Sequence, residues 1–156
     1  MPAARPKSLR IAAPVIPTDD RRYYTYSAPF SNILPGTTQT YAFSIHSDSW
    51  FELIKQTQNS YMDPTGAAGF FQATDVLAGI HYPGLLVMIK ETDTQAQWMD
   101  IATPVTCLFG TAKQPFVLAQ SRLIAPNTTV SVQVSNTYTV DTIASVTLSF
   151  VGRRIY

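Results

Sequence analysis

The segment Thr128-Thr-Val-Ser-Val-Gln-Val-Ser-Asn136 alternates apolar and polar residues, and so does the segment Thr142-Ile-Ala-Ser-Val-Thr-Leu-Ser-Phe-Val151. A period of two is typical of a β-strand that buries one face and exposes the other. The alternation therefore predicts two strands whose larger apolar side chains face one core. The side chains that we expect in this core are Val130, Val132, Val134, Val146, Leu148 and Phe150.

Further strand-length runs precede these two, separated by turn residues such as Pro83-Gly84 and Pro126-Asn127. The pattern predicts an all-β protein, an antiparallel β-sandwich that is jelly-roll-like and has about eight strands. Residues 49–54 fit a strand or a short helix, and the polar residues 56–69 are expected to form a surface loop. The remaining runs are predicted as a strand buried on both faces at 85–90 and a hairpin of 104–109 with 116–119.

The first 28 residues differ in composition from the rest of the chain. Prolines recur in them too often for a helix, which divides the chain into an extended N-terminal arm at 1–28 and a β-sandwich domain at 29–156. A frayed terminus is the alternative, but the apolar residues and tyrosines of the arm favour a role in binding a neighbouring molecule. The residues that we expect to make these contacts are Arg5, Arg10, Arg21, Arg22, Tyr23 and Tyr24.

The chain is poor in charge. Charged residues make up 13% of the sequence, hydrophobic residues make up 46%, and the formal net charge is +1. Because solubility normally depends on dispersed surface charge, this composition indicates a surface that is covered by partners, copies of the chain included. No apolar run is long enough to cross a membrane and the first residues do not resemble a signal peptide, so we expect assembly in a cytoplasm without membrane contact.

Residues with catalytic or ligand-binding chemistry are few and scattered. His46-Ser47-Asp48 contains the residue types of a catalytic triad, but side chains this close along a strand end point in different directions. No cluster has the spacing of a metal site or of a phosphate-binding loop, and no basic field is present for nucleic acid. We therefore expect no enzymatic activity, no cofactor, no metal and no small-molecule substrate, and we expect Cys107 to be an inert core thiol.

Aromatic residues raise one alternative function, a sugar-binding platform on the sandwich. The candidates are Trp50, Tyr61, Phe70, Phe71, Tyr82 and Trp98. Most of them lie in apolar runs, where packing in the core is the simpler explanation. Tyr61 is the exception because it falls in the polar segment 56–69, and we count it among the expected partner-binding residues.

The C-terminal forty residues also carry a resemblance. The run Arg122-Leu-Ile-Ala-Pro-Asn127 before an alternating strand, with a final strand that closes on Phe150-Val-Gly152, resembles jelly-roll cement or decoration proteins of tailed-bacteriophage heads. The resemblance implies a structural protein of the virion that lies on the capsid surface. It also implies the major capsid protein and further copies of the chain, as a dimer or trimer, as partners.

Two other functions remain open from the sequence. The same sandwich folds occur in tail, collar and baseplate components of phage particles, which are present in few copies where a decoration protein is present in many. The third possibility is the carbohydrate-binding module, for which binding on a glycan array is the discriminating observation.

Overall fold

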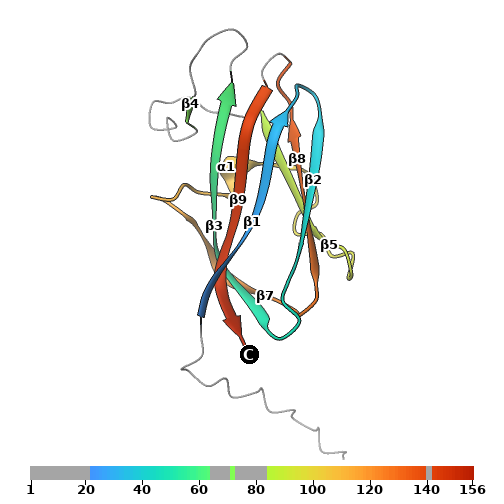
Figure 1. The fold of residues 1–156 in the computed structure, drawn as a ribbon, viewed down its shortest axis with the longest axis vertical. Helices are drawn as coiled ribbons and strands as arrows, with labels where there is room; N and C mark the ends of the chain where they lie inside the picture. Colours follow the sequence, from blue (N-terminus) through green and yellow to red (C-terminus); the bar gives the residue numbers. More distant parts are fainter. Residues whose placement is uncertain (1–21, 64–70, 73–83, 140–141) are drawn as a thin grey trace, which may run out of the picture.

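The computed structural model describes residues 22–63, 71–72, 84–139 and 142–156, which form two antiparallel β-sheets packed face to face (Figure 1). The strands are β1 Arg22–Ile33, β2 Thr38–Ser44, β3 Trp50–Asp63, β4 Phe71–Gln72, β5 Leu85–Glu91, β6 Thr103–Pro104, β7 Phe116–Ile124, β8 Thr129–Asn136 and β9 Thr142–Ile155. The helix α1, Val105–Leu108, is a single turn. In this part of the chain, no helix is long and apolar enough to cross a membrane.

The order of the strands is that of a jelly roll. One sheet has the order β1-β9-β3, with β7 and the two-residue β4 also paired to β3, and the other has the order β2-β8-β5-β6. Apart from β4 and the step from β5 to β6, each strand lies in the opposite sheet from the one before it, as in a double-sheet jelly roll. The predicted antiparallel sandwich is therefore confirmed.

The core lies between the sheets and is built by the two strands whose alternation was clearest. Val132 on β8 and Leu148 on β9 are both fully buried, and Val132 pairs with Tyr41 of β2 on one side and Ile89 of β5 on the other. The six side chains expected to face one core have relative exposures of 1% or less: Val130, Val132, Val134, Val146, Leu148 and Phe150. This prediction is confirmed.

The boundary predicted between arm and domain is wrong, because the sandwich begins before residue 29. Strand β1 pairs with β9 in an unbroken register from Arg22 opposite Arg154 to Ser31 opposite Ser145. Tyr26 and Ala28 on this strand are buried in the core. Residues 22–28 are therefore a strand of the domain, and the rest of the predicted arm, residues 1–21, lies outside the described residues.

Three local predictions are also corrected. Of residues 49–54, all but the first belong to strand β3, and this strand continues to Asp63, so the first half of the expected loop at 56–69 is part of the sheet. The expected hairpin of 104–109 with 116–119 does not form, because β6 pairs with β5 while β7 pairs with β3. Strand β5 alternates buried and partly exposed residues, so only one of its faces is in the core.

Predictions for two single residues, Cys107 and Asn127, have opposite outcomes. Cys107 lies on α1 and is exposed, so the prediction of a buried core thiol is wrong. Asn127 adopts a left-handed backbone conformation with φ of 62° in the turn before β8, which confirms the turn expected after Pro126.

Candidate functional site

The candidate site lies on the outer side of the first sheet, at the end where β1 begins and β9 ends (the lower end in Figure 1). The register places Tyr23 of β1 beside Arg153 of β9, Arg153 beside Glu52 of β3, and Glu52 beside Leu123 of β7. Side chains in one such row stand on the same face of the sheet. We call this row, together with Trp50 at the start of β3, the terminal face.

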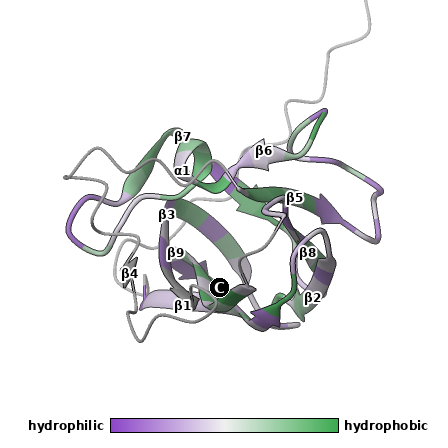
Figure 2. Ribbon diagram, turned by 90° about the horizontal axis from the view of Figure 1, so that it is seen from above, coloured by the Kyte–Doolittle hydropathy of each residue, from purple (hydrophilic) through white to green (hydrophobic). Residues whose placement is uncertain are grey.

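Large apolar side chains are exposed on the terminal face. Tyr23 is 73% exposed, Leu123 is 55% exposed and Trp50 is 45% exposed. Val117, in the next row on β7, is 60% exposed. Strand β7 is coloured largely as hydrophobic in Figure 2 although it lies at the edge of its sheet. Exposed apolar side chains gathered in one place mark an interaction site, whereas isolated ones need no explanation.

Arg153 provides the positive charge of the terminal face. Its guanidinium carbon lies 5.6 Å from the ring centroid of Tyr23, within the range of a cation–π contact. Its Nε atom is buried without a hydrogen-bond partner among the described residues. The neighbouring Glu52 accepts a hydrogen bond from the hydroxyl of Ser121 at 3.0 Å. The terminal face therefore combines exposed aromatic and aliphatic surface with one incompletely bonded arginine.

Arg154, the next residue, points to the opposite side of the sheet and is fully engaged within the chain. Its Nη2 donates to Asp48 at 2.6 Å and its Nε donates to the hydroxyl of Ser49 at 2.9 Å. The guanidinium also lies over the rings of Tyr24 and Tyr156, 5.4 Å and 5.2 Å from their centroids. These contacts join β1 and β9 to the connection between β2 and β3, and they hold the ends of these strands in place on the side of the sheet opposite to the terminal face.

The ion pair changes the pKa values of both partners. Desolvation alone would raise the pKa of Asp48, but the hydrogen bonds from Arg154 and Ser49 and the charge of Arg154 outweigh it, so the pKa lies below its ordinary value. Desolvation likewise opposes the charged form of Arg154, but the hydrogen bond with Asp48 and its charge raise the pKa of the guanidinium. Both groups are therefore charged across the physiological pH range.

Behind this pair, the tyrosines of β1 form an aromatic cluster. The ring of Tyr26 stacks on Phe43 at 5.1 Å and meets Phe51 edge-on at 4.9 Å. Its hydroxyl accepts a hydrogen bond from the backbone of His46, and burial raises the pKa of Tyr26 more than this bond lowers it. The imidazole Nε2 of His46 lies 3.4 Å from the hydroxyl of Tyr24. His46 is thus a neighbour of tyrosines, while Asp48 is bound by Arg154, so they form no catalytic pair.

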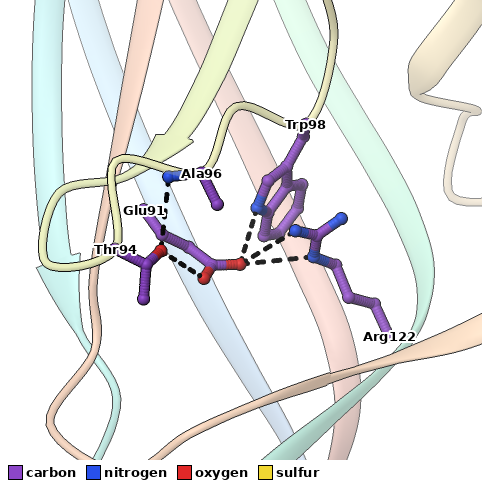
Figure 3. Close-up of polar contacts among 5 residues, drawn as sticks. All are labelled: Glu91, Thr94, Ala96, Trp98 and Arg122. Carbon is purple, nitrogen blue, oxygen red and sulfur yellow. Dashed lines mark hydrogen bonds and ion pairs between the residues drawn. The ribbon is translucent and has the colours of Figure 1, made fainter.

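A second polar cluster joins the two sheets away from the terminal face (Figure 3). Glu91, at the end of β5, accepts hydrogen bonds on Oε1 from Arg122 of β7 at 3.0 Å and from the indole of Trp98 at 3.0 Å. The hydroxyl of Thr94 donates to its other oxygen at 3.1 Å. The guanidinium of Arg122 also lies 4.5 Å from the centroid of the Trp98 ring. All these groups satisfy one another, which indicates a structural role for the cluster.

The structure describes three of the residues expected to bind a partner. Tyr23 lies on the terminal face, Tyr24 is half-buried behind it, and Arg22 is exposed at the start of β1. Tyr61 lies near the far end of β3, and its side chain is outside the described residues. Arg5, Arg10 and Arg21 fall in the undescribed segment 1–21.

Sequence reasoning missed the contributions of Trp50 and Leu123 to this face. Trp50 was expected in the core, but it is exposed because the alternation of β3 turns the adjacent Phe51 inward. Trp98 is partly buried and packs against the core, and the other candidates for a sugar platform lie outside the described side chains. Across the described residues, no group of three His, Cys, Asp or Glu side chains is placed to hold a metal ion.

Comparison with known proteins adds little to this geometry. No family model matches the sequence, and no curated protein matches it. Among solved structures, the chain is similar to dimeric latent PorU from Porphyromonas gingivalis, with a TM-score of 0.36 and 10% sequence identity. The match covers 85% of this chain and 13% of the PorU chain. A likeness at this level carries no argument about function.

Proposed function

We propose that this chain is a structural virion protein, a cement or decoration protein that binds and stabilises a bacteriophage capsid shell. The observation that carries the proposal is the terminal face, where Tyr23, Trp50 and Leu123 are exposed around Arg153. Aromatic residues and arginine are enriched where protein interfaces carry most of their binding energy. The segment 1–21 continues from the same end of the sandwich, so arm and face can contact one neighbour together.

The composition of the chain supports the same proposal. A protein that bridges shell subunits buries surface on several sides, and unpaired charge buried at such contacts is strongly unfavourable. A charged fraction of 13% with a net charge of +1 fits a surface of this kind. The jelly roll is an architecture of viral capsid domains and of lectins, and this support is an analogy of fold only.

The proposed partners are the major capsid protein and further copies of the chain. Arg153 is suited to a carboxylate of the capsid protein, because a guanidinium forms charge-assisted hydrogen bonds with carboxylates. We propose that residues 1–21, with Arg5, Arg10 and Arg21, clamp a neighbouring subunit. The start of β1, with Arg22, Tyr23 and Tyr24, then connects this arm to the sandwich.

A binding experiment on undecorated phage heads tests the proposal. The double variant Tyr23→Ser with Leu123→Ser is expected to weaken binding about tenfold or more, because truncation of side chains at the centre of an interface has effects of this size. Deletion of residues 1–21 is expected to abolish binding and leave the sandwich folded. The matched control is Thr147→Ala, on the same outer face but several rows away. Unchanged binding by the double variant and by the deletion would contradict the proposal.

A second candidate function is a carbohydrate-binding module. The observation that favours it is the exposure of Trp50 at 45% and of Tyr156 at 54% at one end of a sandwich, since amphipathic aromatic rings stack on sugars. A glycan array separates the two candidates. Binding that Trp50→Ala abolishes and Phe116→Ala preserves would support this candidate over the capsid shell.

A further inference from the structure

Strand β1 has an open edge. It lies at the end of its sheet, with β9 on one side only, and it is twelve residues long. The sequence from Tyr23 to Ile33 contains no charged residue. Natural proteins usually protect long edge strands with charged side chains, bulges or a covering segment. An uncharged edge of this length is therefore a template for pairing with another strand.

Two observations show which backbone groups face this open edge. The carbonyl of Ser31 accepts a hydrogen bond from the side-chain amide of Gln39 on β2 at 3.0 Å, so this carbonyl is directed away from β9. Pro29 has no N–H, and within a sheet proline is tolerated where the N–H would face away from the neighbouring strand. The register with β9 has no shift between Arg22 and Ser31. The backbone groups of Tyr23, Thr25 and Ser27 therefore face the open edge as well.

The same two observations limit where another strand can pair. At Ser31 the edge carbonyl is already occupied by Gln39, and at Pro29 there is no donor. The usable edge is therefore the segment from Tyr23 to Ser27, whose outward side chains are an aromatic ring and two small hydroxyl groups. An antiparallel copy of this segment is complementary to it, because no charges would meet and each donor would find an acceptor.

We propose that two copies of the chain pair edge to edge through β1, antiparallel about a twofold axis at Thr25. Thr25 then lies opposite Thr25 of the second copy, and Tyr23 lies opposite Ser27, which gives about six backbone hydrogen bonds. A register centred on Ser27 is worse, because it places Pro29 opposite Thr25 and leaves a carbonyl without a donor. The two sheets become one continuous sheet, and the pairing does not depend on the proposed function.

Charges of opposite sign introduced at Thr25 test this register in the full-length chain. Like charges directly opposite each other destabilise a strand pair and opposite charges stabilise it. Thr25→Lys and Thr25→Asp are each expected to raise the dimer dissociation constant about tenfold or more, and an equimolar mixture of the two should dimerise again. Sedimentation equilibrium gives the dissociation constants. Thermal melting should show that both variants stay folded, since Thr25 is exposed.

Thr40→Lys is the matched control, because Thr40 is an exposed threonine on the edge strand of the other sheet, β2. It should leave the dissociation constant unchanged. The proposal would be overturned by a wild-type chain that remains monomeric up to millimolar concentration, or by dimers that survive both charge variants. Failure of the lysine and aspartate variants to associate when mixed would also overturn it, because residue 25 would then not lie opposite its copy.

Discussion

Two adjacent arginines at the end of β9 have different roles because they point to opposite sides of the sheet. Arg154 donates hydrogen bonds to Asp48 and Ser49 and lies over two tyrosine rings, so its bonding is completed within the chain. Arg153 has one ring contact, with Tyr23, and a buried Nε atom without a partner. The first arginine stabilises the end of the sandwich, and the second is the one that we propose to bind a partner there.

The ion pair between Asp48 and Arg154 predicts that the stability of the domain depends on pH. Because the folded-state pKa of Asp48 is lowered, its stabilising contribution is present above its unfolded pKa and is lost as the pH falls through its folded pKa. Asp48→Asn should therefore lower the melting temperature at neutral pH, and the difference from wild type should shrink as the pH falls below the ordinary pKa of an aspartate and through the lower folded-state pKa of Asp48. Calorimetry across this range measures it. A difference that persists undiminished in acid would show that the charge of Asp48 is not responsible.

The effect of a substitution in a strand depends on which face of the sheet the residue occupies. Two neighbouring residues of β8 provide a matched test. Val132 is fully buried and Gln133 is exposed. Val132→Asp places a carboxylate in the core and is expected to destabilise the domain by more than about 4 kcal/mol, whereas Gln133→Asp should change stability by less than about 0.5 kcal/mol. Urea unfolding compares the two. Equal effects would mean that β8 does not have the described register.

Gly152 on β9 allows β3 and β9 to lie close together. A Cβ atom at this position would collide with the backbone carbonyl of Glu52 on β3 and would press on the ring of Phe51. Gly152→Ala should therefore force β3 and β9 apart and destabilise the domain by about 1–3 kcal/mol or more. Chemical denaturation measures the loss, with Ser149→Ala on the same strand as the control. A stable Gly152→Ala variant would show that the strands are less closely spaced.

The sequence predicted the elements in which alternation is regular and failed where a short segment carries two signals. Strands β8 and β9 were predicted because each alternates over its length. The start of β1 was missed, although Tyr24, Tyr26 and Ala28 alternate inward, because the outward residues include tyrosine and proline, which are also typical of an arm. Residues 104–109 begin with proline and then form a single helical turn, which no periodicity can reveal in six residues.

For the whole molecule, the sequence predicted the sandwich and not the site. Tyr23 was identified as a contact, but its neighbours on the terminal face come from three other strands and meet only through the strand register. Trp50 is exposed and the adjacent Phe51 is fully buried because their side chains point to opposite sides of the sheet. Composition alone does not show which of the two points outward. Pairing between distant strands had to be known before these residues could be grouped.

The proposal that this chain works in an assembly rests on exposed apolar side chains at one end, a low content of charged residues and an open β1 edge. If the proposed function is right, this chain is part of a phage particle, and the most direct test is a cryo-EM reconstruction of that particle. The account predicts the jelly roll on the outer surface of the head shell, with its terminal face against the major capsid protein at repeated positions. A map that places the chain only in the tail or baseplate, or that finds the terminal face exposed to solvent, would contradict it.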